Sequence, residues 1–267
     1  VYEALKRGID HETIYKITKI DWWFLDKMQH LANLENGLAK CNGVLTEEQY
    51  KTAKKYGFQD KTIKRLAQVD KLPVENYRAG FKMVDTCAAE FSAETPYFYS
   101  TYDDENEAAE FIEQHPTDKK KIIVFGSGPI RIGQGIEFDY ASVHCVWALK
   151  EKGYDVVIVN NNPETVSTDF DTADRLYFEP LTDEDVMNII RVEKPVGVVV
   201  AFGGQTAIKL TKHMAEHGVN ILGTPPDAID AAEDRERFDE LLEQLKIKRP
   251  QGFTVMTCDE ALEVANK

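Results

Sequence analysis

Residues 122–135 read Ile-Ile-Val-Phe-Gly-Ser-Gly-Pro-Ile-Arg-Ile-Gly-Gln-Gly, and this stretch decides the fold. An apolar run that ends in a glycine-rich turn is typical of a buried strand in a parallel sheet and of the loop that follows it. A second apolar run, residues 156–159, ends in Asn-Asn-Asn-Pro-Glu-Thr at 160–165. Open α/β sheets bind ligands outside the carboxyl ends of their strands, so these two loops mark the expected ligand edge.

The same rhythm of strand, turn and helix continues on both sides of these loops, and it predicts a doubly wound parallel sheet over residues 119–226. The expected strands are 122–125, 156–159, 175–178, 196–202 and 219–222. The expected helices are 137–152, 183–193 with Thr182 or Asp183 as the cap, and 203–217. The last helix opens with Gly-Gly-Gln-Thr at 203–206, which gives the ligand edge a third loop.

Residues 1–118 show helical spacing of apolar side chains, which predicts an all-helical domain followed by an extended connector over 85–102. Thr46 and Gln49 have the spacing of a capping box for one of these helices. The cluster Trp22-Trp23-Phe24 is expected on a helix face that is buried in the core or in a subunit interface, rather than in a ligand platform. Residues 227–267 predict a charged helix over 235–245, a strand over 253–255 and the start of another helix.

Composition excludes several classes of protein. The net charge of −14 without a basic stripe argues against nucleic acid as a partner. No apolar run approaches the roughly 18 residues that cross a membrane. The four cysteines form no CxxC pair, which favours a reducing cytoplasm over a disulfide or zinc framework. Because the chain starts at Val1 and stops within a helical pattern, we expect an interior piece of a longer protein.

A dinucleotide site is the first alternative for the glycine loop, since Gly126-Ser127-Gly128 follows a strand. The complete fingerprint needs a third glycine where Arg131 stands, and a carboxylate after the second strand where Asn160 stands. A P-loop is excluded more firmly, because no Gly-Lys-Ser/Thr follows the glycines. A second class of function also remains open. The chain would then be a free-standing nucleotide- or metabolite-binding module, or a scaffold built on the helical domain.

Several long motifs resemble the large subunit of carbamoyl-phosphate synthase, and more closely the second of its two related halves. These motifs are residues 126–140, 162–169, 175–180, 203–206 and 233–238, together with 20–25 and 85–91 upstream. Ile130 departs from the pattern, since many members carry Asn there. The resemblance implies an oligomerisation domain with its connector over 1–118, a Rossmann-like pre-ATP-grasp domain over 119–226 and a truncated ATP-grasp start over 227–267.

The resemblance also implies an ATP-dependent ligase that makes carbamoyl phosphate from bicarbonate, glutamine-derived ammonia and two ATP, for arginine and pyrimidine biosynthesis. Its implied cofactors are ATP with Mg²⁺ or Mn²⁺ and K⁺ in the full-length enzyme, with none bound tightly by this piece, which we expect to be inactive alone. The implied partners are the other segments of the large subunit, the glutaminase small subunit, and a second copy bound through the helical domain.

The expected site residues lie in the three loops, which the family uses as walls of a channel for carbamate, and at one arginine. The loop residues are Gly126, Gly128, Arg131, Gly133, Gln134, Gly135, Asn162, Glu164, Thr165, Gly203, Gly204, Gln205 and Thr206. Arg235 matches the family arginine that contacts nucleotide phosphates, for which a guanidinium is suited by its rigid fork of donors. The motifs contain no expected catalytic residue and no expected metal ligand.

Overall fold

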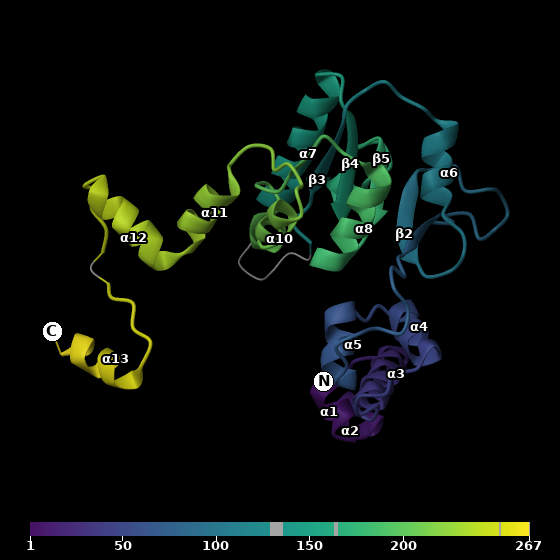
Figure 1. Ribbon diagram of the computed structural model, residues 1–267, viewed down its shortest axis with the longest axis horizontal. Helices are drawn as coiled ribbons and strands as arrows, with labels where there is room; N and C mark the ends of the chain where they lie inside the picture. Colours follow the sequence, from purple (N-terminus) through teal and green to yellow (C-terminus); the bar gives the residue numbers. More distant parts are fainter. Residues whose placement is uncertain (129–135, 163–164, 251, 267) are drawn as a thin grey trace. The chain divides into compact units, whose positions relative to one another are not determined.

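The computed structural model describes residues 1–128, 136–162, 165–250 and 252–266, and it divides into two compact units (Figure 1). The first unit is Val1–His115 and the second is Pro116–Lys267.

The first unit begins with five helices that bury two small apolar cores. The helices are α1 (Tyr2–Lys6), α2 (His11–Thr18), α3 (Trp22–Ala39), α4 (Glu47–Lys55) and α5 (Asp60–Ala67). One core contains Leu5, Ile14 and Leu25, and the other contains Leu38, Tyr50, Ala53 and Ile63. The predicted capping box of Thr46 and Gln49 is confirmed at the start of α4.

The predicted aromatic face of α3 is only partly right. Trp22, Trp23 and Phe24 are 46%, 59% and 56% exposed, so they are not part of the core of their own unit. Burial in the core is therefore wrong for this cluster, and burial in a subunit interface stays a prediction.

The prediction of an all-helical first unit is wrong, because a strand before the connector pairs with a strand within it to form a hairpin. Strands β1 (Gly80–Met83) and β2 (Tyr97–Thr101) pair antiparallel and are followed by α6 (Glu107–Gln114). Phe81 and Phe98 are fully buried, and the ring of Phe98 lies 5.9 Å from that of Phe111 on α6. A strand of four or five residues gives too few alternations for the period-two pattern to be recognised in a sequence.

Helix α1 is held on α3 by a pH-sensitive contact. The Tyr2 hydroxyl donates to Glu35 Oε2 at 2.8 Å, and Lys6 Nζ donates to Glu35 Oε1 at 2.6 Å. Burial, together with the bond to Glu35, raises the pKa of Tyr2 from 10.0 to about 12. Because the folded pKa is the higher one, this contact stabilises fully below pH 10, and its contribution is lost as the pH rises through about 12.

We therefore expect one phenol to titrate near pH 12 in the difference in phenolate absorbance between the native chain and Tyr2→Phe. The variant Glu35→Ala should return that midpoint toward 10.0. A Tyr2 midpoint of about 10 in the native chain would contradict the contact.

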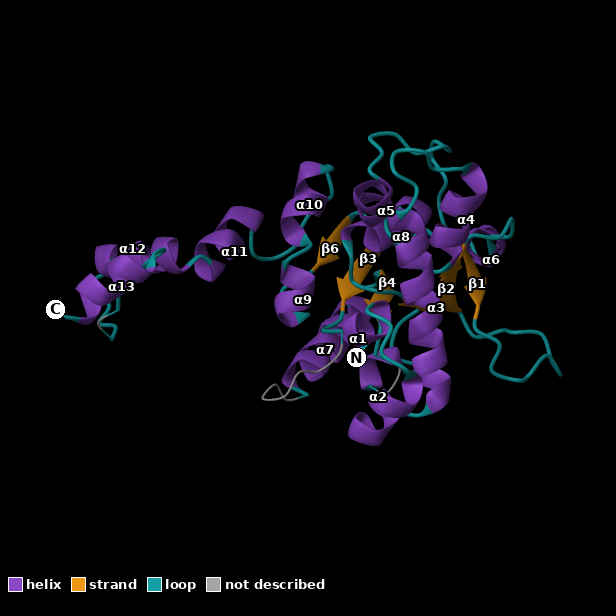
Figure 2. Cartoon of the chain, turned by 90° about the horizontal axis from the view of Figure 1, so that it is seen from below, coloured by secondary structure: helices purple, strands orange, loops and turns teal. Residues whose placement is uncertain are grey.

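The second unit is a parallel α/β sheet, as predicted. Its strands are β3 (Lys121–Phe125), β4 (Asp155–Asn160), β5 (Arg175–Phe178) and β6 (Gly197–Val199), and they lie in the order β5-β4-β3-β6. Figure 2 shows these strands between α7 (Glu137–Glu151) on one side and α8 (Asp183–Glu193) and α10 (Thr211–Glu216) on the other. The chain reverses its direction of travel across the sheet between β3 and β6, which makes this the topological switch point.

Several predicted elements of the second unit are shorter than expected. The run 196–202 forms only the three residues of β6, and 219–222 contributes a single bridge between Ile221 and Val198. The helix expected over 203–217 is divided into α9 (Gly204–Ile208) and α10. β6 is the last strand of the sheet and is extended on its outer side only by the bridge to Ile221, so little pairing is available there to lengthen either segment.

The last part of the chain contains α11 (Pro226–Glu233), α12 (Arg235–Gln244) and α13 (Cys258–Ala265). The strand predicted over 253–255 is wrong, because these residues form no strand and Phe253 is 68% exposed. A strand needs a partner for its backbone groups, and a local apolar pattern cannot supply one.

Candidate functional site

The loops after β3 and β6 touch at the switch point. Gly203 ends the turn after β6, and a Cβ built on it would lie 2.6 Å from the carbonyl oxygen of Gly126 and 2.7 Å from that of Phe125. Only glycine permits so close an approach of two backbones. The geometry brings Gly126 and Gly203 together, as expected from their positions after neighbouring strands.

Asn160, the last residue of β4, ties the glycine loop to the loop that follows β4. Its side chain is fully buried, and its Oδ1 accepts from the backbone N–H of Gly128 at 3.0 Å and of Asn161 at 2.9 Å. Its Nδ2 donates to Ser167 Oγ at 3.1 Å. An amide can accept and donate at the same time, so one side chain satisfies groups from both loops.

Asp139 on α7 fixes the far end of the same loop. Its carboxylate is buried and accepts from the Thr165 hydroxyl and, at 3.2 Å, from the backbone N–H of Ser167. The Thr168 hydroxyl donates to the carbonyl oxygen of Asn162 at 3.1 Å, and this bond closes the loop on itself. The predicted residues Asn162 and Thr165 therefore both take part in hydrogen bonds, Asn162 through its carbonyl oxygen and Thr165 through its hydroxyl.

The third loop contributes two of its residues to the same place. Thr206 Cγ2 lies 3.7 Å from the position that a Cβ on Gly128 would take, and Gly128 has a φ of +68°. Gly204 has a φ of +61° and packs against the ring of Phe138. Gln205 is exposed on α9. The expected site residues Arg131, Gly133, Gln134, Gly135 and Glu164, and the departure at Ile130, lie outside the described residues.

The structure does not bring Arg235 to these loops through any hydrogen bond or ion pair of the residues it describes. Arg235 is exposed at the first position of α12, and this helix packs on α11. The neighbouring Arg237 is paired with Asp227 and with Asp230. Of the two arginines, Arg235 is the one whose guanidinium is available to an anion.

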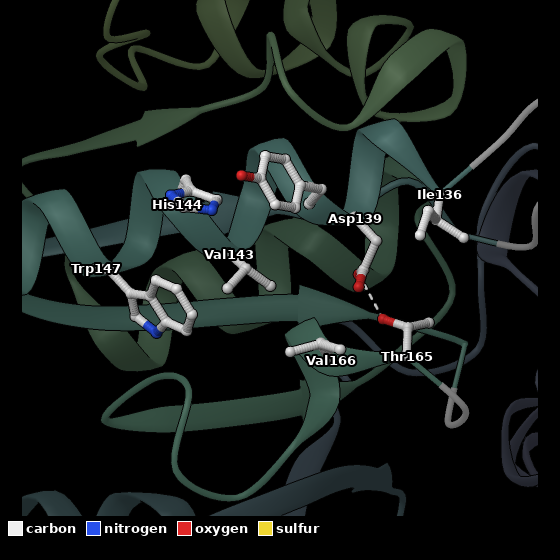
Figure 3. A pocket seen from close by; sticks show the side chains of 8 residues that line it. Ile136, Asp139, Val143, His144, Trp147, Thr165 and Val166 are labelled. Atoms are coloured by element: carbon white, nitrogen blue, oxygen red, sulfur yellow. Dashed lines mark hydrogen bonds between the residues drawn. The ribbon is translucent and has the colours of Figure 1, made fainter.

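An apolar groove of about 340 Å³ lies beside the loops, along α7 (Figure 3). It is lined by Ile136, Asp139, Tyr140, Val143, His144, Trp147, Thr165 and Val166. This groove is not predicted by the sequence analysis above. The sequence does contain a signal for it, because the aromatic residues at positions 140, 144 and 147 recur at helical spacing and therefore share one face of α7.

In the part of the site that the structure describes, the arrangement is suited to binding and positioning. Asp139, the carboxylate of the groove, is occupied by two hydrogen bonds, and the described loop side chains nearby, Asn160, Thr165 and Ser167, are amides and hydroxyls that are hydrogen-bonded to one another or to Asp139. The described ranges hold no group of three acidic, histidine or cysteine side chains placed to bind a metal ion. Among the same residues, no helix is both long and apolar enough to cross a membrane.

Two family models match the sequence. The first is described as the carbamoyl phosphate synthase preATP-grasp domain and matches residues 118–231. The second is described as the carbamoyl-phosphate synthetase large chain, oligomerisation domain, and matches residues 1–82.

Similar curated proteins bear the name carbamoyl phosphate synthase large chain. That of Agathobacter rectalis is 55% identical over 273 residues, and that of Lachnoclostridium phytofermentans is 56% identical over 274 residues. Each match covers 100% of this chain and 25% of the relative, so the chain spans a quarter of the length of these proteins.

Among solved structures, the chain is similar to the biotin carboxylase domain of a single-chain bacterial carboxylase, with 16% identity and a TM-score of 0.40 over 55% of this chain and 34% of that one. It is also similar to the biotin carboxylase subunit of pyruvate carboxylase, with 20% identity and a TM-score of 0.35 over 55% and 33% of the two chains. At scores this low, these likenesses carry no argument about fold or function.

Proposed function

Because the chain belongs to the carbamoyl phosphate synthase large-chain family, we propose that it forms part of the ligase half that phosphorylates carbamate. Its role there is to supply loops along the path of the intermediate. The observation that supports this role is that the loops after β3 and β4 are tied together by Asn160, while the loop after β6 approaches the first of them closely at Gly203 and Gly126. Residues 1–118 would serve as the oligomerisation domain and connector, 119–226 as the pre-ATP-grasp domain and 227–267 as the start of the ATP-grasp domain.

The chemistry of the proposed reaction favours such loops. Carbamate is short-lived in water, so it must pass between the two halves of the enzyme inside protein. In the described part of these loops, Asn160 and Thr165 are already hydrogen-bonded to neighbouring groups and are therefore less available to hold the intermediate, and glycines leave space beside them. ATP and a divalent cation would act in the full-length enzyme, and the exposed guanidinium of Arg235 is suited to a nucleotide phosphate.

A substitution at Gly135 in the full-length enzyme tests this role. We expect Gly135→Phe to leave bicarbonate-dependent ATP hydrolysis largely unchanged and to lower carbamoyl phosphate formation about tenfold or more, because an aromatic ring obstructs the path between the halves. Both products are measured in the same reaction. The control is Gly37→Phe, at an exposed helix position where a new Cβ meets no atom within 4 Å. Unchanged synthesis in Gly135→Phe would contradict the proposed role.

Self-association through the first unit is the second part of the proposal. The exposed cluster of Trp22, Trp23 and Phe24 lies within the residues that match the oligomerisation domain. Tryptophan at the centre of an interface commonly contributes 2 kcal/mol or more, which is about thirtyfold in affinity. We expect Trp23→Glu to weaken self-association at least thirtyfold, measured by light scattering over a concentration series. The control is Glu48→Ala on α4, and equal masses for all three proteins would contradict the interface.

A further inference from the structure

One chain of hydrogen bonds connects the glycine loop to helix α7. Asn160 Oδ1 accepts from the backbone N–H of Gly128 at 3.0 Å, and its Nδ2 donates to Ser167 Oγ at 3.1 Å. The hydroxyl oxygens of Ser167 and Thr165 lie 3.0 Å apart, and the Thr165 hydroxyl donates to Asp139 Oδ1 (Figure 3). Because Asn160 and Ser167 are fully buried, each hydrogen of this chain must find its acceptor within the protein.

The direction of the chain is fixed from both ends. A hydroxyl has one hydrogen, and Thr165 gives its hydrogen to Asp139, so Thr165 Oγ1 must accept from Ser167. Ser167 then has no hydrogen left for Asn160. At the other end a backbone N–H can only donate, so the amide oxygen of Asn160 faces Gly128 and its NH₂ group faces Ser167. Position 160 therefore needs a side chain that accepts on one side and donates on the other.

We propose that Asn160 positions the glycine loop for the passage of carbamate, and that it does so as an amide, which a carboxylate cannot replace. Its Oδ1 also accepts from the backbone N–H of Asn161 at 2.9 Å and of Asn162 at 3.4 Å, so one oxygen holds both loops. The amide lies against Gly126, where a Cβ would lie 2.6 Å from its Cγ and Nδ2 atoms. This proposal rests on the proposed function, to which it adds the residue that sets the start of the loop.

A carboxylate at position 160 leaves the chain one hydrogen short. Asn160→Asp keeps the oxygen that faces Gly128 and replaces the group that donates to Ser167 by a second oxygen. If the Ser167 hydrogen turns toward this oxygen, the oxygens of Ser167 and Thr165 face each other with no hydrogen between them. The substitution also adds a second carboxylate to the network of the buried Asp139, and like charges in a buried site repel each other.

The opposite substitution leaves one hydrogen too many. Asp139 accepts from the Thr165 hydroxyl and from the backbone N–H of Ser167. In Asp139→Asn one of these donors faces an NH₂ group, so one hydrogen of the chain has no acceptor. The two substitutions together restore the count. The amide at position 139 donates to Thr165, Thr165 donates to Ser167, and Ser167 donates to the carboxylate at position 160, so the chain runs in the opposite direction.

The two substitutions, made singly and together in the full-length large chain, test the proposal. We expect each single variant to lower carbamoyl phosphate formation about tenfold or more, and Asn160→Asp with Asp139→Asn to recover most of the loss, because the two side chains act in one network. Should a single variant fail to fold, the double variant still decides, because it is expected to fold and to be active. A double variant no better than the poorer single variant would overturn the proposal.

Hydrogen exchange tests the positioning of the loop without reference to activity. Asn160→Ala in the same protein removes the acceptor of the Gly128 N–H, and we expect that N–H to exchange about tenfold faster or more, read by mass spectrometry on peptides spanning residues 126–128. An unchanged exchange rate would overturn the proposal. If Gly135→Phe leaves synthesis unchanged, the proposed passage of carbamate fails, while the exchange of Gly128 still decides whether Asn160 holds the loop.

A destabilising substitution far from the loops is the control. Glu193 bonds Arg175 and Lys121 at the amino ends of β5 and β3, the opposite ends from the glycine loop. We expect Glu193→Ala to leave the exchange of the Gly128 N–H and carbamoyl phosphate formation unchanged at temperatures where the variant is folded. Equal exchange in Glu193→Ala and Asn160→Ala would show that Asn160 acts only through general stability, and that result would also overturn the proposal.

Discussion

The variant Glu193→Ala is expected to lower the free energy of unfolding of the α/β unit by about 3–5 kcal/mol. Glu193 ends α8 at the edge of the sheet opposite the three loops, and its side chain is fully buried. Its carboxylate accepts from Arg175 Nε at 2.9 Å, from the Tyr177 hydroxyl at 2.7 Å, and from Lys121 Nζ at 2.6 Å. These partners come from the first and third strands of the unit, β3 and β5.

The size of the effect follows from the cations that remain, the buried Arg175 and the partly buried Lys121. Burial opposes the charge on Arg175, but Glu193 and Asp155 more than offset it and raise the pKa of the guanidinium above its ordinary value. Arg175 therefore cannot escape the loss of Glu193 by releasing its proton. After the substitution Asp155, 2.6 Å from Arg175 Nη2, is the acidic partner left in the network. The buried Arg175 then keeps only the carboxylate of Asp155, and the partly buried Lys121 loses its ion pair with Glu193, which is the costly case for a broken buried pair.

Urea unfolding followed by the fluorescence of Trp147 measures this loss, in a background where Trp22 and Trp23 are replaced by phenylalanine. The chain has three tryptophans, so the signal then reports the second unit alone. The control is Asp227→Ala, which removes an ion pair to Arg237 from a side chain that is 90% exposed and should change stability by less than about 1 kcal/mol. Equal effects of the two variants would contradict a structural role for the buried network.

The sequence predicted the parallel sheet well, because a strand buried on both faces appears as a continuous apolar run. The runs 122–125 and 156–159 were placed to within one residue of β3 and β4, and 175–178 coincides with β5. The edge segments were less predictable, since their pairing depends on a neighbour rather than on their own residues. The strand predicted over 196–202 is therefore longer than β6, and the strand predicted over 253–255 does not form. The hairpin of β1 and β2 is not predicted at all.

The sequence predicts where the candidate site lies, but it does not predict which side chains contact one another there. Because parallel strands end at the same edge of a sheet, the sequence predicts that Gly126, Asn162 and Gly203 lie at one edge. It could not give Asn160 its role, because that depends on which backbone N–H groups come within 3.0 Å of its side chain in the folded chain. The charge network cannot be predicted from the sequence either, since Arg175 and Glu193 are 18 positions apart and meet only in the folded chain.

The second large effect is expected at the switch point, where Gly203→Ala should lower the free energy of unfolding by about 1–3 kcal/mol or more. The φ of Gly203 is −86°, which alanine adopts readily, so the cost is steric and not conformational. A methyl group there would lie 2.4 Å from Ala207 Cβ and within 2.7 Å of the carbonyl oxygens of Phe125 and Gly126. Two of these three neighbours are backbone atoms at the end of β3, and they cannot move without shifting the strand.

A double variant separates the two kinds of neighbour. Ala207→Gly removes the side-chain obstacle and leaves both carbonyl oxygens, so Gly203→Ala with Ala207→Gly should recover only part of the stability lost, after correction for Ala207→Gly alone. Full recovery would show that the backbones of the two loops are not in close contact. The control is Gly252→Ala, where a new Cβ meets no atom within 4 Å and little change is expected. Under the proposed function, the contact with Gly126 also shapes the expected ligand edge, so we expect Gly203→Ala in the full-length enzyme to impair carbamoyl phosphate formation at temperatures where the variant is still folded.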